Sequence, residues 1–485
     1  MPNDVKFHGR RNNGATHLLS FKRSIMDMQG VVGVYSKQGA CTKSLQILYG
    51  VQHRGQESSG LTAAGDNSLR TWKGRGLASG VFSEQFRSFV HPNDYAVIGC
   101  ASGENADNGF PPLKSLSHER YVFSVALDGY FPRDGGTNEG VVARTLHQCL
   151  SEGNGFRDAL AETMRKHRDA YYSLVACVWD REEGVSRLYA ARDERGVRPL
   201  YVAANDASSY VASESAPIDV LENMGEHFIL RRDVAPGSIL CIDEHGIEET
   251  RVLEPRRAHC VFEWVYFGRP DSVIEGRTVH SARKALGHAL VELHGLREEY
   301  GTTEAKPDDL VVIPVPDSGR SVCTGVAEGL GVTADEGVIK NAYMGRTYIM
   351  DNPETRKLAS DLKHNIIRET VDGRKVIITD DSIVRGTVSE SVAQNLVKAG
   401  AREVEYLVSY APIFHPCFSD PPDKPLAAQP YEGKSLGEIG DLVSRGLPSI
   451  NRVRYNDEEH ILAAVGLPRE HICTYCISGR NPFQR

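Results

Sequence analysis

The stretch Val376-Ile-Ile-Thr-Asp-Asp-Ser-Ile-Val-Arg-Gly-Thr387 runs from apolar residues to two adjacent carboxylates, then to hydroxyls and a glycine. Its apolar part predicts a buried strand over Arg374–Thr379, and the periodicity of Val388–Ala399 predicts a helix. Backbone N–H groups in such a loop, with a helix N-terminus behind them, form a cradle for phosphate. The two carboxylates can accept from sugar hydroxyls and lie near a magnesium ion. We therefore predict that a phosphorylated ribose binds to Asp380, Asp381, Ser382, Ile383, Val384, Arg385, Gly386 and Thr387.

A second loop of the same kind is Ile313-Pro-Val-Pro-Asp-Ser-Gly-Arg-Ser321, where a predicted strand ends in a proline-bounded turn before a helix. Such a turn is common on its own, but paired with the first loop it predicts a diphosphate site at Asp317, Ser318 and Gly319. The long polar segment between the loops is of the kind that forms lids. Its cations are predicted to close over a diphosphate leaving group, although solvated surface charge is an alternative for each of them: Lys340, Arg346, Lys363 and Arg368. Of these, Lys363 and Arg368 are predicted to be catalytic, together with Asp380 and Asp381.

The order of predicted elements divides the chain into two domains and an extension. Residues 1–28 are expected to be a flexible extension, and 29–255 an α+β domain of stacked antiparallel sheets. Residues 256–485 are expected to be an α/β domain, because strands at Asp309–Val315, Arg374–Thr379 and Arg402–Ser409 alternate with helices and imply a parallel sheet. One long helix is predicted over Ser281–Tyr300, and a polar, helical, cysteine-bearing tail from about residue 410.

Composition restricts the class of protein. At 485 residues the chain is too long for one core, and 40% hydrophobic and 25% charged residues are ordinary for a soluble protein. The net charge of −8 argues against a general nucleic-acid or membrane-surface binder, and no apolar run is long enough to span a bilayer. Ten cysteines without a secretory signal favour a reducing cytoplasm.

Further motifs accompany the two loops: Gln52-His-Arg-Gly-Gln56, Arg192-Asp-Glu-Arg-Gly-Val-Arg-Pro-Leu200, Tyr266-Phe-Gly-Arg-Pro-Asp-Ser272 and Gly337-Val-Ile-Lys-Asn341. Together they resemble the amidophosphoribosyltransferase family over nearly all of the chain from Gln29 onward. The resemblance implies an N-terminal αββα glutaminase (Ntn-hydrolase) domain joined to a type I phosphoribosyltransferase domain. It also implies phosphoribosyl diphosphate (PRPP) and magnesium as ligands, and a homodimer or homotetramer.

Four positions of the family's glutamine pocket differ in this chain. Gln29 stands where the family has an N-terminal Cys, and it is preceded by Met28. The nucleophile there is a thiol whose own free amine acts as the base, and Gln29 supplies neither. Three further positions differ. Ser102 stands where the family has the carboxylate-binding Arg, Asp128 where it has the oxyanion-hole Asn, and Thr137 where it has the amine-binding Asp. These changes predict a glutaminase-dead domain; a shifted nucleophile, Cys41 or Cys100, is the alternative and would need processing.

The sequence Cys473-Thr-Tyr-Cys476 is compatible with zinc, redox and iron–sulfur roles. Some members of the resembled family hold a 4Fe–4S cluster on four cysteines. The matching residues here are Cys260, Cys417, Cys473 and Cys476, so the resemblance implies a 4Fe–4S cofactor, with zinc on four thiolates as the main alternative.

The nitrogen nucleophile is the remaining question, and three readings stay open. In the first, a heterocyclic base attacks the ribose; glutaminase-dead homologues resembling this chain occur in pathways to deazapurine nucleosides, so 7-cyano-7-deazaguanine is the best guess. Local departures from the family predict acceptor contacts at Ala342, Tyr343 and Tyr410, although ordinary drift explains them equally well. The second reading is an ammonia-dependent enzyme that makes phosphoribosylamine. The third is a non-catalytic PRPP-binding regulator, against which the retained Lys363 and Arg368 argue.

Overall fold

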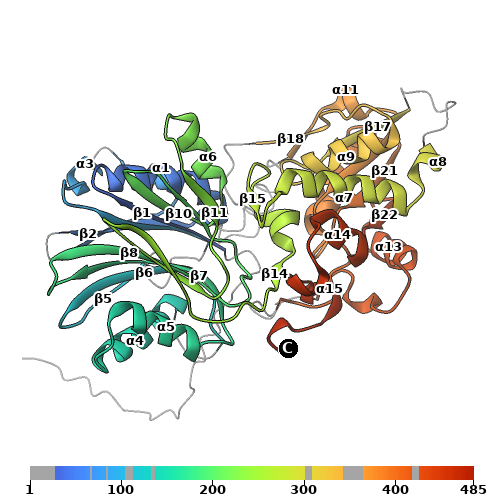
Figure 1. Cartoon of the computed structure of the whole chain (residues 1–485). Coiled ribbons are helices and arrows are strands. Elements are labelled where there is room, and N and C mark those ends of the chain that lie inside the picture. The colour runs from blue at the N-terminus through green and yellow to red at the C-terminus, as the bar shows by residue number, and fades with distance from the viewer. Residues whose placement is uncertain are drawn as a thin grey trace, which may run out of the picture.

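The computed structural model describes residues 28–65, 68–83, 86–103, 113–132, 137–300, 309–341, 364–417 and 425–484. These residues form two units that lie side by side, the first coloured blue to green and the second yellow to red in Figure 1. Predicted residues Ala342, Tyr343, Arg346 and Lys363 lie outside the described ranges, as does the extension up to residue 27.

Two antiparallel sheets make up the N-terminal unit. The seven-stranded sheet has the order β11 (Leu230–Asp233), β9 (Tyr201–Ala204), β10 (Ser208–Ala212), β1 (Gln29–Ser36), β4 (Ala96–Ser102), β2 (Ser58–Gly65), β3 (Ser68–Arg75). The six-stranded sheet has the order β13 (Gly246–Arg251), β12 (Ser238–Asp243), β8 (Val185–Arg192), β7 (Tyr171–Asp180), β6 (Tyr121–Tyr130), β5 (Lys114–Ser117).

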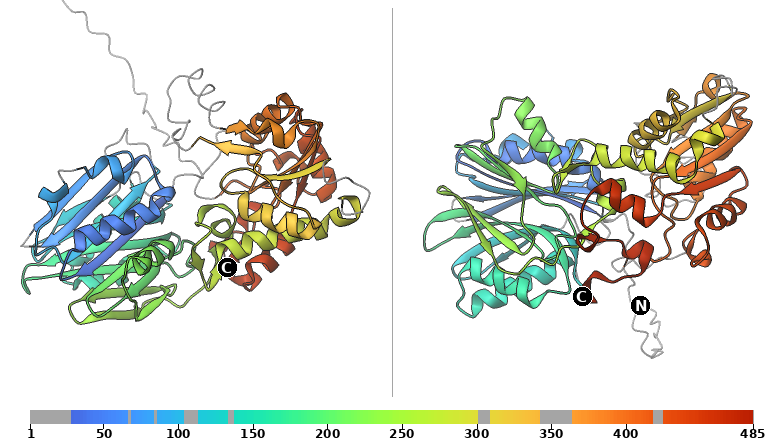
Figure 2. Two further views of the ribbon diagram at one scale, coloured as in Figure 1. Left: turned by 90° about the horizontal axis from the view of Figure 1, so that it is seen from above. Right: turned by 45° about the vertical axis from the view of Figure 1, so that its right-hand side comes forward.

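The two sheets stack face to face, and helices cover their outer faces (Figure 2). Along β1, Val31 points into the core between the sheets, whereas Val32 packs toward the helices on the outer face. This alternation is what a strand buried on both faces requires. The helices are α1 (Ala40–Val51) and α6 (Ala216–Asn223) on the larger sheet, and α4 (Asn138–Ser151) and α5 (Phe156–Lys166) on the smaller one. The predicted αββα architecture is therefore confirmed.

The C-terminal unit is built on a parallel sheet, as predicted. Its strands, in spatial order, are β17 (Leu310–Pro314), β20 (Lys375–Asp380), β21 (Glu403–Val408) and β22 (Arg452–Tyr455). Strand β22 corrects the expectation of a helical tail. Its four residues alternate between polar and apolar, which is too short a pattern to identify a strand before its neighbour β21 is known.

Helices cover both faces of this sheet. Val376 and Ile378 of β20 pack toward α12 (Thr387–Lys398) and α13 (Leu436–Arg445), while Ile377 packs toward α7 (Val279–Leu293) and α9 (Arg320–Leu330). The single helix expected over Ser281–Tyr300 is two, α7 and α8 (Leu296–Tyr300), because Gly295 between them has a φ of 57°. Helix α14 (Glu458–Val465) packs against α7.

A small parallel ladder joins the C-terminal tail to the start of the second unit. It pairs β14 (His259–Cys260) with β23 (Ile472–Cys473). Met28 was expected to belong to the flexible extension. It is instead buried in the apolar cluster beside this ladder, and its carbonyl accepts from Gly103 N at 3.0 Å. None of the helices in the described ranges has the length and hydropathy needed to traverse a bilayer.

Candidate active site

The two predicted ligand loops meet at the carboxyl ends of adjacent strands. β17 and β20 are parallel neighbours with Pro314 opposite Thr379, so the loops that follow them leave the sheet at one edge. The backbone ties them together, because Val315 N donates to Thr379 O at 2.9 Å. Side chains also connect them: Ser318 Oγ lies 3.4 Å from Asp380 Oδ1. Ligands of open parallel sheets bind at this edge.

Asp380 and Asp381 are both nearly buried at this edge, with 5% and 7% of their surface exposed. Asp380 Oδ1 accepts from Asp381 N at 2.9 Å, and Asp381 Oδ2 accepts from Ser382 Oγ at 2.5 Å. Burial, and then the charge of Asp381, raises the pKa of Asp380 well above its usual value. Within the described ranges neither carboxylate forms an ion pair with a Lys or Arg, so a bound cation would relieve their mutual repulsion.

The loop after the carboxylates ends at an open helix N-terminus. Gly386 precedes α12 with a φ of 80°, and no side chain caps the first turn of that helix. A Cβ at Gly386 would stand 2.7 Å from Leu447 Cδ2, so both conformation and space favour glycine. Arg385 and Thr387 are exposed on either side. The arrangement presents backbone N–H groups of the kind that bind phosphate.

The diphosphate loop has a similarly tight backbone. A Cβ at Gly319 would stand 2.2 Å from Thr379 O, so only glycine allows the two loops to approach this closely. Lys340, at the end of β18 (Val338–Lys340), reaches back to the loop, with its Nζ 3.0 Å from Asp317 Oδ2. Burial opposes the shift, but the hydrogen bond from Lys340 lowers the pKa of Asp317. The structure thus places Lys340 beside this loop, and its contact with diphosphate stays a prediction.

Arg368 is not brought to these loops. It begins the short helix α11 (Arg368–Val371), and its Nε donates to Ala399 O at 3.2 Å. Ala399 follows the last residue of α12, whose first turn borders the phosphate loop. A twelve-residue helix is about 18 Å long, so Arg368 lies at the opposite end of α12 from the predicted ligand.

Tyr410 is placed differently from the prediction of an acceptor-stacking face. Its side chain is fully buried, its ring packs edge-on against Phe262 at 5.0 Å, and its hydroxyl lies 3.0 Å from Cys476 Sγ. Its backbone contacts the loop of the two carboxylates, since Tyr410 N donates to Asp381 O at 2.9 Å. The ring is turned inward because the apolar cluster behind the loop takes it up, which local sequence does not reveal.

Tyr406 is a site residue that sequence reasoning missed. It lies in β21 opposite Ile378, and its phenol donates to Asp380 Oδ2 at 2.7 Å. In the sequence it is one aromatic residue in the strand Glu403–Val408, where a core position is the ordinary reading. The pairing of β21 with β20 is the signal that identifies it.

In the N-terminal unit, the positions of the family's glutamine pocket surround a buried charge network. Arg54 is fully buried, and its guanidinium contacts Glu214 Oε1 at 2.8 Å, Glu263 Oε1 at 2.8 Å and Asp128 Oδ2 at 3.1 Å. Arg198 adds a second cation, 2.9 Å from Glu263. Asp128 Oδ1 also faces Gln29 N at 3.4 Å. These contacts join β1 and β6 to Glu263, at the start of the second unit.

The four predicted metal-binding cysteines gather at the joint between the units. Cys260 is opposite Cys473 in the β14–β23 ladder. The segment that leads to Cys417 is tied to Cys476, because the Cys476 carbonyl accepts from Phe414 N at 3.0 Å and from His415 N at 3.1 Å. Burial raises the pKa of Cys476 to about 12, with the thiol of Cys417 contributing. Among the described residues no three His, Cys, Asp or Glu side chains form a ready site for one metal ion. A 4Fe–4S cluster needs its four cysteines farther apart than a site for one metal ion does, because each thiolate binds a different iron.

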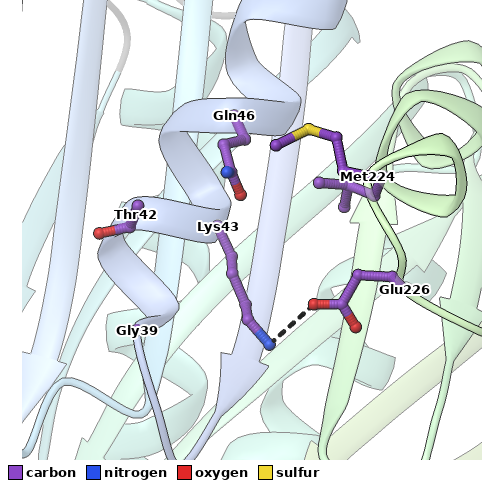
Figure 3. Close-up of a pocket in the computed structure, with 7 residues that line it drawn as sticks. Gly39, Thr42, Lys43, Gln46, Met224 and Glu226 are labelled. Atoms are coloured by element: carbon purple, nitrogen blue, oxygen red, sulfur yellow. Dashed lines mark ion pairs between the residues drawn. The ribbon is translucent and has the colours of Figure 1, made fainter.

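A surface hollow of about 390 Å³ lies away from both loops, on the outside of the N-terminal unit between α1 and α6 (Figure 3). The ion pair between Lys43 Nζ and Glu226 Oε1, 3.2 Å long, crosses it. Its lining holds one carboxylate, Glu226, which is already paired with Lys43, so we place the candidate ligand site at the loops of the parallel sheet and not at this hollow.

Comparison with known proteins agrees with this geometry over almost the whole chain. The chain is 31% identical over 481 residues to the amidophosphoribosyltransferase of Methanothermobacter thermautotrophicus, covering 94% of this chain and 95% of that protein. For the amidophosphoribosyltransferase of Archaeoglobus fulgidus, the identity is 32% over 481 residues, with 94% and 98% covered. No family model matches the chain.

Two solved structures superpose on the chain. A structure described as the allosteric regulatory enzyme of purine biosynthesis gives a TM-score of 0.78 at 28% identity, covering 93% of this chain and 96% of that one. Glutamine PRPP amidotransferase from B. subtilis, in complex with ADP and GMP, gives 0.76 at 28% identity, with 93% and 97% covered.

Proposed function

The chain belongs to the amidophosphoribosyltransferase family, and from this membership we propose that it transfers the 5-phosphoribosyl group of PRPP to a ring nitrogen of a heterocyclic base, without using glutamine. Diphosphate is the second product. The best candidate acceptor is a 7-deazaguanine such as 7-cyano-7-deazaguanine. The observation that carries the proposal is the pair of loops that meet at Asp380, while Asp128, which the resemblance aligns with the oxyanion-hole Asn, is a carboxylate paired with Arg54.

Each part of PRPP has a counterpart at the sheet edge. Asp380 and Asp381 accept from the ribose 2- and 3-hydroxyls, and the N-terminal turn of α12 with Ser382 and Thr387 holds the 5-phosphate. The diphosphate lies against three residues of the facing loop and strand: Ser318, Gly319 and Lys340. Arg346 and Lys363, outside the described ranges, are proposed to complete the cover over the diphosphate.

Magnesium fits this donor set, because two adjacent buried carboxylates favour a hard cation. Bound there, it would neutralise charge on the departing diphosphate. In the reaction the bond from ribose C1 to the diphosphate oxygen breaks, and the lone pair of the acceptor nitrogen forms the new C1–N bond. The proton of that nitrogen is released to solvent. The Asp380 and Asp381 carboxylates hold the ribose in place as positive charge develops on the ring.

Several contacts support a pocket that does not hydrolyse glutamine. Gln29 N is a peptide nitrogen joined to Met28, and it faces Asp128, so it is not a free amine that could act as a base. Thr137 caps α4 by accepting from Gly140 N at 3.1 Å. The alternative nucleophile Cys41 lies 3.2 Å from Asp94, and burial followed by this carboxylate raises its pKa well above the usual value. A thiol held protonated is a poor nucleophile.

The test supplies PRPP and magnesium with 7-cyano-7-deazaguanine, with ammonium or with glutamine, and follows diphosphate release and product mass. We expect turnover with the base and no glutamate from glutamine. Turnover with ammonium alone rejects the base reaction in favour of phosphoribosylamine synthesis, and PRPP binding without turnover on any acceptor favours the regulator. Asp381→Asn should abolish turnover, while the matched control Asp335→Asn, an exposed aspartate in the same unit, should not.

We further propose that Cys260, Cys417, Cys473 and Cys476 hold a 4Fe–4S cluster. The cluster would tie the tail to the joint between the units, where β14 and β23 already pair. Iron and sulfide analysis of anaerobically purified protein, with its visible absorbance, distinguishes the cluster from zinc. A colourless protein with one zinc per chain rejects the cluster.

A further inference from the structure

Tyr406 makes a side-chain contact to Asp380 from behind the ligand loops. Its ring is fully buried in the core beneath α12, and its hydroxyl lies 2.7 Å from Asp380 Oδ2. Tyr406 is paired in register with Ile378. Ile378 lies two residues before Asp380 and therefore on the same face of the sheet, so the Tyr406 side chain leans along the strand to reach the Asp380 carboxylate. A buried phenol with a single proton donates it to the carboxylate oxygen.

The other contacts of Asp380 do not fix the orientation of its carboxylate independently of the ligand loops. Oδ1 accepts from Asp381 N at 2.9 Å and faces Ser318 Oγ at 3.4 Å, and both groups belong to the ligand loops themselves. Tyr406 instead belongs to the sheet, in strand β21, which pairs with β20 on one side and with β22 on the other. Its bond therefore anchors one carboxylate oxygen before any ligand arrives, leaving the carboxylate pre-oriented.

We propose that Tyr406 is a positioning residue for PRPP, acting through the Asp380 carboxylate that receives a ribose hydroxyl. This inference rests on the proposed role of Asp380. Hydrogen bonds to charged groups are worth roughly a tenfold to hundredfold change in an equilibrium. Part of that is expressed in ligand affinity, so Tyr406→Phe should weaken PRPP binding about tenfold.

The chain offers a matched control in the same core. Tyr455 of β22 is also fully buried in this apolar cluster, and within the described residues its hydroxyl has no hydrogen-bond partner. Phe in place of either tyrosine removes one oxygen from a filled core position, so both variants should fold. Any difference in PRPP affinity between the two variants is therefore due to the hydrogen bond that the Tyr406 hydroxyl makes, and not to the loss of an oxygen from the core.

The experiment titrates full-length protein with PRPP and magnesium by calorimetry, which needs no acceptor. Wild type and Tyr455→Phe should bind equally, and Tyr406→Phe about tenfold more weakly, with KM for PRPP rising more than kcat falls in a turnover assay. In the Asp380→Ala background, which removes the acceptor oxygens, Tyr406→Phe should add little, because a residue acting through Asp380 has lost its target.

The outcomes separate the two proposals. If wild type does not bind PRPP, the proposed function fails. If wild type binds and Tyr406→Phe binds equally well, the positioning role is refuted. It is also refuted if the loss of affinity from Tyr406→Phe adds fully to the loss from Asp380→Ala. If Tyr406→Leu weakens binding while Tyr406→Phe does not, the ring acts by packing alone, which also refutes the role.

Discussion

Replacing Arg54 with methionine should strongly destabilise the folded chain, because the guanidinium is shared by three buried carboxylates. Its nitrogens lie 2.8 Å from Glu214, 2.8 Å from Glu263 and 3.1 Å from Asp128, and the side chain is inaccessible to solvent. Removing one member of a buried ion pair typically destabilises a protein by about 3–5 kcal/mol, since the partner is left uncompensated. For a unit of this size that corresponds to a fall in Tm of roughly 6–20 °C.

The dependence of the Tm on pH below neutrality gives a second, independent test of this reasoning. In the wild type the pKa of Glu214 is well below its usual value, against the effect of burial, because His53 and Arg54 face it. Such a carboxylate stabilises the fold above its unfolded pKa, about 4.5, and that stabilisation is lost as the pH falls through the folded value. Without Arg54, burial should raise the pKa values of the stranded carboxylates, so they take up protons as the pH falls toward 5. The difference in Tm between variant and wild type should therefore narrow from pH 7 to pH 5.

The assay is thermal unfolding by calorimetry at pH 7 and pH 5. The matched control is Arg157→Met, which removes an exposed guanidinium paired with Glu248 and should change the stability by less than about 1 kcal/mol. A fall in Tm for Arg54→Met no larger than that of Arg157→Met would refute the reasoning. So would a difference from wild type that widens toward pH 5.

The other predictions concern the two proposed ligand sites and the proposed absence of glutaminase activity. Gly319→Ala should weaken PRPP binding more than tenfold, because its Cβ would meet Thr379 O at 2.2 Å and push the loops apart; calorimetry with Gly437→Ala, an open position, as control measures this. Gln29→Cys should release no glutamate from glutamine, because the new thiol would follow Met28 and lack a free amine; glutamate formation above the wild-type rate contradicts this. Cys476→Ser should lower the iron and sulfide content of anaerobically purified protein, whereas Cys323→Ser, at a buried cysteine outside the cluster set, should leave the iron content as it is.

Contiguous sequence was enough to predict the strand, loop and helix that hold the proposed ribose-phosphate residues. Asp380, Asp381, Ser382 and Gly386 follow one another between a strand and a helix, so their relative placement depends on local geometry. The parallel sheet was equally accessible, because strands and helices alternate at lengths that permit only crossover connections. Strand β22 escaped this reasoning, since four residues carry too little pattern without the neighbouring strand.

Residues whose roles depend on distant partners could not be placed this way. Tyr410 was expected to face an acceptor, but the apolar cluster that includes Phe262 turns its ring inward. Arg368 was expected at the diphosphate, but it contacts the carbonyl of Ala399 at the far end of α12. Which way a side chain turns depends on what packs beside it, and nothing near it in the sequence records that.

The proposed ligand loop could thus be identified from neighbouring residues, because phosphate and ribose contacts would be made by a few consecutive backbone and side-chain groups. The anchoring of Asp380 by Tyr406, separated by 26 positions, and the meeting of Arg54 with Glu263, separated by 209, depend on strand pairing and on the packing of two units. Burial removes such groups from water and makes each contact strong, and only the folded chain determines which groups are buried together.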